Sequence, residues 1–160
     1  MQARLEAHKV SPAAYQAMIG LEMFVRKQSK LEPALIELIK VRVSQINGCS
    51  YCIDMHSKDA RAGGETEQRL YALSAWEETP FFTDRERAAL ALAEAITLVS
   101  EDHVPDSVYE KAKESFSEEE LVNLTLAVIT INGWNRLAIT FRMVPGEYQP
   151  VTHKAEGGKA

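Results

Sequence analysis

The chain has 160 residues, 46% of them hydrophobic and 26% charged, and a formal net charge of -5. These values are typical of one globular domain with a sizeable core, and the acidic balance argues against a general nucleic-acid binder or a ligand of anionic membranes. Because the N-terminus is charged where a signal peptide is apolar, and because the apolar stretches are shorter than the roughly 18–20 residues of a membrane span, we expect a cytoplasmic protein.

The elements predicted along the chain are helices, because apolar residues recur at three and four positions and no stretch alternates as a strand does. The Ser11-Pro12 pair and the proline at position 33 are typical of helix starts. Thr83 with Glu86, and Ser117 with Glu120, form capping-box patterns. Six or seven helices are therefore predicted, over 12–27, 33–47, 49–63, 65–76, 84–101, from 105 onward, and over 118–143.

The sequence is interpreted as a single all-α domain over residues 1–144, followed by a polar, glycine-containing tail over 145–160. Such a tail is expected to be disordered or to lie on a neighbouring molecule.

Cys49 and Cys52 are the only cysteines, and they lie one turn apart at the start of the helix predicted after Gly48. Unpaired backbone N–H groups at that point favour an anion, so we expect the pKa of the Cys49 thiol to fall below the roughly 8.5 of a free cysteine. His56 lies four residues after Cys52 on the same helix face and can accept or return a proton. A nucleophilic thiol, a second thiol to resolve it and a base are what thiol–disulfide exchange or peroxide reduction requires.

Glu37 is the candidate to orient His56. It lies twelve residues before Cys49 in the otherwise apolar stretch ALIELIKV, where a carboxylate is unusual. If the two helices pack as an antiparallel pair about the turn at Asn47-Gly48, the Glu37 carboxylate reaches His56 only at a favourable crossing.

Two other interpretations apply to the same residues. In one, the two thiols are buried and inert. In the other, Cys49, Cys52, His56 and Glu37 bind zinc, although three ligands within eight residues of one helix do not match the usual zinc spacing. We expect no metal and no other cofactor.

The spacing of Glu37, Cys49, Cys52 and His56 resembles the active-site motif of the alkylhydroperoxidase D (AhpD) family, within the carboxymuconolactone decarboxylase-like superfamily. The segments CSYCIDMHSKDARAGGE, LSAWEETPFFTDRERAALALAEAIT and NGWNRLAI also resemble its single-domain members, so that the resemblance covers most of residues 34–139. It implies an all-α fold in which two central helices form an antiparallel hairpin that carries the Cys-X-X-Cys pair.

The resemblance also implies a thiol-dependent peroxidase that reduces hydrogen peroxide or organic hydroperoxides. Carried over, Glu37 and His56 form a proton relay that deprotonates Cys52, which attacks the peroxide, and Cys49 resolves the product as a disulfide. The helix terminus favours Cys49 as the more acidic thiol, whereas His56 favours Cys52, and we follow the family. Tyr51 departs from the family pattern, because AhpD proper has a relay histidine at that position.

The expected partners are the peroxide, an external dithiol or a lipoylated or thioredoxin-like reductant, and further copies of the chain. The last predicted helix is apolar over too much of its circumference to be covered within one chain. Single-domain relatives form rings of dimers, so we expect a homo-oligomer, with a hexamer favoured, and no nucleic acid or membrane. In this helix, Trp134 is expected in the core, and Asn132 and Arg136 at the pocket or at an interface.

Two other functions stay open. One is a cofactor-free decarboxylase of the carboxymuconolactone type, whose chemistry needs no thiols. The other is a non-enzymatic redox-sensing module whose disulfide changes its oligomer.

Overall fold

The computed structural model describes residues 2–150, and every regular element in that range is helical, as predicted. All seven predicted segments are helical, and the single-turn helix α1 is an element that the periodicity did not predict. The elements are α1 (Ala7–Val10), α2 (Pro12–Lys27), α3 (Pro33–Asn47), α4 (Ser50–Ala62), α5 (Glu67–Ala72), the 3-10 helix η1 (Leu73–Glu78), α6 (Asp84–Thr97), α7 (Val99–Asp102), α8 (Asp106–Lys113) and α9 (Glu118–Phe141).

Three predicted details are wrong. The helix expected over 84–101 breaks at Leu98, which separates α6 from α7. The last helix ends at Phe141, because Arg142 adopts a left-handed conformation with φ of 55°. Ser11 precedes α2, but its side chain makes no capping hydrogen bond there.

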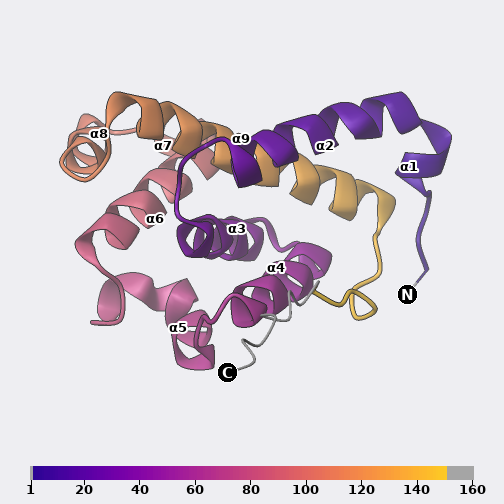
Figure 1. The fold of residues 1–160 in the computed structure, drawn as a ribbon, viewed down its shortest axis with the longest axis horizontal. Helices are drawn as coiled ribbons and strands as arrows, with labels where there is room; N and C mark the ends of the chain where they lie inside the picture. The colour runs from indigo at the N-terminus through magenta and orange to yellow at the C-terminus, as the bar shows by residue number, and fades with distance from the viewer. Residues whose placement is uncertain (1, 151–160) are drawn as a thin grey trace, which may run out of the picture.

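Helix α3 lies at the centre of the fold. Figure 1 shows it between α9 and α2 on one side and α4 on the other, with α6 beside it. Its apolar side chains Leu35, Leu38, Ile39 and Val43 are buried on several faces. A helix enclosed in this way presents residues to more than one neighbour, which places Glu37 where α4 can meet it.

A tight turn joins α3 and α4 into the predicted hairpin. Gly48 adopts φ of 67° and ψ of 30°, a left-handed conformation that glycine enters without steric penalty. The backbone N–H of Cys49 then donates to the Ser44 carbonyl at 2.9 Å. Cys49 is therefore the residue immediately before α4, and its sulfur accepts the backbone N–H of Cys52.

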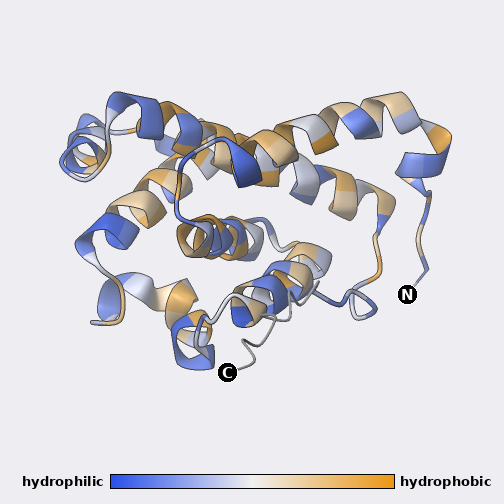
Figure 2. Ribbon diagram, in the orientation of Figure 1, coloured by the Kyte–Doolittle hydropathy of each residue, from blue (hydrophilic) through white to orange (hydrophobic). Residues whose placement is uncertain are grey.

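Helix α9 begins with three glutamates and continues with mainly apolar residues, as Figure 2 shows. Ser117 and Glu120 form the predicted capping box at its start, and Thr83 and Glu86 form the one at the start of α6. The buried polar side chains of α9 are Asn123, Thr130 and Asn135.

The first residues of the predicted tail lie against α4. The Tyr148 hydroxyl donates to Asp59 at 2.6 Å, the backbone N–H of Gly146 donates to Asp54 at 3.0 Å, and Lys58 donates to two carbonyls of the segment. Residues 151–160 of the predicted tail lie outside the described residues.

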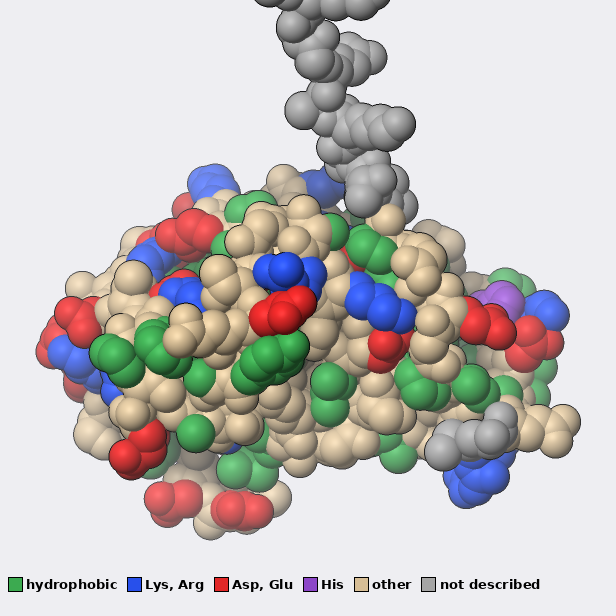
Figure 3. Space-filling model, turned by 90° about the horizontal axis from the view of Figure 1, so that it is seen from below, with side chains coloured by type: hydrophobic (Ala, Val, Ile, Leu, Met, Phe, Trp, Pro, Cys, Tyr) green, Lys and Arg blue, Asp and Glu red, His purple; other side chains and the backbone are tan. Residues whose placement is uncertain are grey.

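No helix within residues 2–150 is both long and apolar enough to cross a membrane. On the face drawn in Figure 3, acidic side chains lie next to basic ones.

Candidate active site

The two cysteines lie together at the N-terminus of α4. Their sulfur atoms are 2.6 Å apart and share a hydrogen bond, and both residues are free cysteines. The backbone N–H of Cys52 points to the Cys49 sulfur at 3.4 Å. Cys49 is 1% exposed and Cys52 is 2% exposed, so both sulfurs lie in a site that excludes most water.

The two thiols differ in acidity. The hydrogen bond with the Cys52 thiol is the largest cause that lowers the pKa of Cys49 from 9.0 to about 7; burial opposes it, and backbone N–H groups and the Asn135 side chain add to it. The same hydrogen bond, together with burial, raises the pKa of Cys52. The directions of these two pKa shifts favour a thiolate on Cys49 over one on Cys52.

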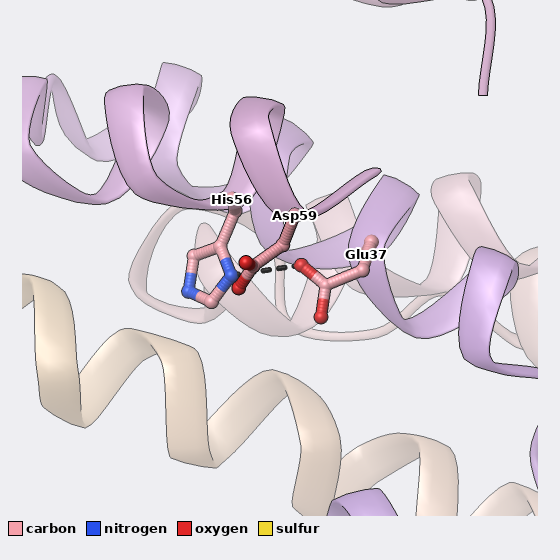
Figure 4. A group of neighbouring side chains, drawn as sticks. All are labelled: Glu37, His56 and Asp59. Carbon is pink, nitrogen blue, oxygen red and sulfur yellow. Dashed lines mark hydrogen bonds and ion pairs between the residues drawn. The ribbon is translucent and has the colours of Figure 1, made fainter. Parts of the chain in front are cut away.

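The crossing of α3 and α4 brings Glu37 to His56. The Glu37 Oε2 atom lies 2.8 Å from His56 Nδ1, and His56 is 1% exposed. Burial raises the pKa of the Glu37 carboxyl, but the hydrogen bond to His56 and the nearby charges of Lys40 and Arg26 outweigh it, so the pKa is lowered. Figure 4 shows Nδ1 on the side of Glu37 and the second ring nitrogen on the opposite side of the imidazole. An ionised Glu37 thus holds the ring with Nδ1 protonated and Nε2 free to accept a proton.

A buried charge cluster surrounds this pair, and sequence patterns did not predict it. The Lys40 ammonium is fully buried and lies 2.5 Å from Glu22 Oε1, which also accepts from Arg26 at 2.6 Å. Lys40 and Arg26 lie 3.8 and 3.9 Å from the Glu37 carboxylate. Lys40 occupies a core position of α3 because carboxylates from two helices compensate its charge.

Cys52 and His56 open on one cavity of about 340 Å³, whose lining does not include Cys49. Among the described residues, His56 Nε2 is buried and has no hydrogen-bond partner. An unpaired ring nitrogen on the same cavity as a thiol can exchange a proton with a molecule bound there. The other lining residues are Tyr15, Ile19, Glu22, Met23, Arg26, Tyr51, Met55, Trp134, Ala138 and Met143.

The cavity walls are mostly apolar and come from α2, α4 and α9, with Met143 just beyond α9. The rings of Tyr15 and Trp134 meet edge to face with centroids 5.1 Å apart. Trp134, expected in the core, lines this cavity while packing against the core. Tyr51, the residue that precedes Cys52, also lines this cavity.

Glu37 does not line that cavity but lines a second one of about 570 Å³, together with Arg26, Asp59 and Glu65. The Glu37–His56 pair therefore lies between the cavity that Cys52 lines and a second one that several charged side chains line. Such a position gives the imidazole a route for exchanging protons with water.

Among the described residues, Glu37, His56 and Asp59 form a group that could hold a metal ion, with ligand atoms within 4.8 Å of one another. The cysteines do not belong to this group, so the four-ligand zinc set considered from the sequence is not assembled. The Arg26 guanidinium lies 3.4 Å from Asp59, and the Tyr148 hydroxyl donates to the same carboxylate. These donors already compensate the acidic group.

The structure brings together all four residues predicted from the motif. Asn132 and Arg136 do not line the cavity; they join a polar chain that reaches Asn47 at the end of α3. Asn135, which no sequence pattern identified, is buried and hydrogen-bonds Asn47 and Ser44 in the last turn of α3, next to Cys49. A buried amide in the apolar run of the last helix is the same signal that identified Glu37, but it lies 86 positions from Cys49 in the sequence.

Comparison with known proteins identifies relatives of this chain. The model of the carboxymuconolactone decarboxylase family matches residues 12–95. The uncharacterized protein YdfG of Bacillus subtilis is 46% identical over 139 residues, which are 87% of this chain and 94% of that protein.

Solved structures agree. A protein of unknown function from Agrobacterium tumefaciens, ATU0492, named as a candidate antioxidant defence protein AhpD, superposes with a TM-score of 0.88 at 41% identity over 92% of this chain and 100% of that one. The debrominase Bmp8 shares the fold, with a TM-score of 0.78 at 22% identity over 87% of this chain and 74% of that one. The chain therefore belongs to the carboxymuconolactone decarboxylase family, which includes enzymes, and has the AhpD-like fold.

Proposed function

We propose that this protein is a thiol-dependent peroxidase that reduces hydrogen peroxide or organic hydroperoxides with the Cys49–Cys52 pair. The observation that carries the proposal is the arrangement of Cys52 and His56 on one cavity, with the Cys49 sulfur 2.6 Å behind Cys52 and Glu37 holding the imidazole. A cytoplasmic location goes with this proposal, since the chemistry requires a compartment in which dithiols are kept reduced.

In the oxidative half-reaction, Cys52 transfers its proton to His56 Nε2 and attacks the terminal oxygen of the hydroperoxide. The O–O bond breaks, its electron pair leaves with the alkoxide, and the alkoxide takes the proton from His56. Cys52 is now a sulfenic acid. The Cys49 thiolate attacks the Cys52 sulfur, the S–O bond breaks, and the departing hydroxide takes one proton from solvent to become water. The net products are one alcohol, one water and the disulfide.

In the reductive half-reaction, an external dithiol, such as a lipoyl group or a thioredoxin-like protein, supplies two electrons and two protons. Its thiolate attacks the disulfide through the cavity at Cys52, because the cavity reaches that sulfur. Cys49 leaves as a thiolate, to which its low pKa suits it. The second thiol of the reductant then releases Cys52.

The test is a thiol count on the reduced protein before and after one equivalent of cumene hydroperoxide. Wild type should lose two thiols. Cys49→Ser should form a sulfenic acid on Cys52 that dimedone traps, whereas Cys52→Ser should retain its single thiol over the same time. Thiols that survive peroxide in wild type would contradict the proposal.

A second candidate activity is reductive dehalogenation, favoured by the apolar, partly aromatic cavity beside Cys52 and by the shared fold of the debrominase Bmp8. It consumes the same two electrons. Incubation with 2,3,4-tribromopyrrole, followed by bromide release and thiol loss, distinguishes dehalogenation from peroxidase activity.

A decarboxylase of the carboxymuconolactone type would keep its activity when both cysteines are replaced by serine.

We also propose that the chain forms a homo-oligomer, with a hexamer favoured. The support is the exposure of large apolar side chains on α9, namely Val122, Ile129 and Ile139. Light scattering at micromolar concentration tests it, and a monomer would contradict it. A mass that changes with redox state, without peroxide turnover, would instead indicate a redox-sensing module.

A further inference from the structure

Tyr15, in the first half of α2, lines two cavities. One is the cavity of about 340 Å³ that Cys52 and His56 also line. The other has a volume of about 450 Å³, is mostly apolar, and lies between α1, the start of α2 and the end of α9. Among the described residues that line these two cavities, Tyr15 alone is common to both. Its side chain therefore lies where the two cavities meet.

Two contacts between α2 and α9 form the boundary between the cavities. The ring of Tyr15 meets the ring of Trp134 edge to face, with centroids 5.1 Å apart. One turn further along α2, the Met18 side chain lies on Gly133, where an added Cβ atom would come within 2.8 Å of the Met18 Cε atom. Trp134 lines the cavity at Cys52, whereas Gly133 lines the second cavity. Adjacent residues of α9 thus face the two sides of this boundary.

The position of the Tyr15 ring is fixed from two helices. Besides its contact with Trp134, the ring contacts the imidazole of His8 on α1, with centroids 5.8 Å apart. Trp134 in turn packs against the main hydrophobic core. An edge-to-face aromatic contact favours one ring orientation over others. The ring is therefore a fixed part of the cavity wall, although Tyr15 itself is only half-buried.

The boundary limits how long an apolar molecule can be if it is to be enclosed beside Cys52. The second cavity is the larger of the two, so removing the boundary would more than double the continuous space at Cys52. Each methylene that moves from water into apolar surroundings favours binding by about fourfold. A chain that extends past the wall of the first cavity stays in water and gains nothing from its additional methylenes.

We propose that Tyr15 is a specificity-determining residue of this site, whose ring ends the cavity at Cys52 and selects organic hydroperoxides with a compact apolar group over those with a long alkyl chain. The inference rests on the proposed peroxidase function for the reaction that it makes selective. It adds a substrate class to that function and assigns the choice to one side chain. The wall at Tyr15, rather than the cysteine hairpin, then sets which hydroperoxide fits.

The test compares n-butyl hydroperoxide with n-dodecyl hydroperoxide in single-turnover oxidation of the reduced full-length protein. The quantity compared between variants is the ratio of the two second-order rate constants of thiol loss, dodecyl over butyl. In wild type this ratio should be about one or lower, because the additional methylenes remain in water. In Tyr15→Ala it should rise about tenfold, which corresponds to about two further enclosed methylenes.

Two further variants separate the wall from a general loosening of the fold. Tyr109→Ala removes the same side chain from α8, where Tyr109 is exposed and lines neither cavity, and should leave the ratio as in wild type. Ala14 lines the second cavity at an exposed position of α2. Adding Ala14→Phe to Tyr15→Ala should fill that cavity and return the ratio close to wild type.

A binding measurement on the product alcohols, n-butanol and n-dodecanol, uses no peroxide. Intrinsic fluorescence reports binding through Trp134 in the cavity wall, and the ratio of the two affinities should rise in Tyr15→Ala as the ratio of rates does. This rise without peroxide turnover would contradict the proposed function and leave the role of Tyr15 intact. Oxidation by both peroxides with the same ratio in wild type and Tyr15→Ala would do the reverse.

The inference is also overturned if Tyr109→Ala raises the ratio as much as Tyr15→Ala, or if adding Ala14→Phe leaves the raised ratio unchanged. If Tyr15→Ala does not fold, Tyr15→Leu carries the same test, because it removes the ring and keeps an apolar side chain in the wall.

Discussion

Replacing Glu37 by glutamine tests the role of its charge at the candidate site. Glutamine has the same length and can still accept the Nδ1–H of His56 through its side-chain oxygen, so the ring keeps its orientation. What disappears is the negative charge 2.8 Å from the imidazole. The substitution therefore separates electrostatic support of a protonated His56 from simple positioning.

The size of the effect follows from the geometry. A carboxylate and an imidazolium with charge centres about 4 Å apart attract each other by about 4 kcal/mol at an effective dielectric constant of 20. Lys40 and Arg26 lie within 4 Å of the same carboxylate and take up part of this attraction. We therefore expect about half of it, about 2 kcal/mol, to be lost when His56 receives the proton of Cys52. This corresponds to a decrease of about 30-fold in rate.

The assay is a single-turnover reaction of the reduced protein with excess cumene hydroperoxide at pH 7, with quenched samples counted for free thiols. With the peroxide in excess, the first-order rate constant of thiol loss reports the step in which Cys52 attacks, and it does not depend on any reductant. Far-UV circular dichroism and the melting temperature establish that the variant is folded.

Asp59→Asn is the matched control. Asp59 lies within 4.8 Å of Glu37 and His56, but its hydrogen bonds go to Tyr148 and Arg26. Its rate should stay within about threefold of wild type, well inside the change expected for Glu37→Gln. The reasoning is refuted if Glu37→Gln reacts at the wild-type rate, or if Asp59→Asn is slowed equally.

Further predictions concern stability. Lys40→Met leaves Glu22 without its buried ammonium partner and should lower the free energy of unfolding by about 3 kcal/mol in urea titrations, and adding Glu22→Leu should restore most of it. The pKa values of Glu22 and Glu37 are lowered in the folded state, so their contribution to stability is present above about pH 4.5 and is lost as the pH falls through the folded values. The melting temperature should therefore decrease below about pH 4.5. This decrease should be smaller in Glu37→Gln, because glutamine does not titrate. Gly48→Ala forces a side chain into a left-handed conformation and should lower the free energy of unfolding by about 1 kcal/mol. Gly20 lies within α2 with open space around it, so Gly20→Ala should raise the free energy of unfolding by about 0.5–1 kcal/mol. A greater loss of stability in Gly20→Ala than in Gly48→Ala would contradict this.

The hairpin that carries the cysteines could be predicted because its signals are local. Gly48 marks the turn, Cys49 and Cys52 mark the start of α4, and the spacing to His56 fixes the shared face. The meeting of Glu37 with His56 depends on the crossing of α3 and α4, which local spacing leaves open. The family resemblance predicted that Glu37 and His56 meet, which the periodicity alone did not.

The features that the sequence did not predict depend on distant partners. A lysine at position 40 would ordinarily be expected to face solvent. It is buried here because Glu22, eighteen positions earlier, packs against it and compensates its charge. The break at Leu98 has neither glycine nor proline to mark it. Asn135 reaches Ser44 only because α9 crosses the end of α3.

This division between local and distant residues bears on how the site is built. The thiols, the imidazole and the carboxylate come from one hairpin, so their chemistry is specified within twenty consecutive residues, 37–56. The walls of the cavity at Cys52 come largely from α2 and α9, as Tyr15 and Trp134 do. Wall residues can therefore change without disturbing the hairpin, so the same cysteine pair can lie beside cavities of different shape. The exception is Asn135, which lies on α9 one position after Trp134 and donates a hydrogen bond to Ser44 in the last turn of α3, five residues before Cys49. A change in the position of α9 that reshapes the cavity would also move this contact, so the shape of the cavity and the turn that leads to the cysteines are coupled through one helix.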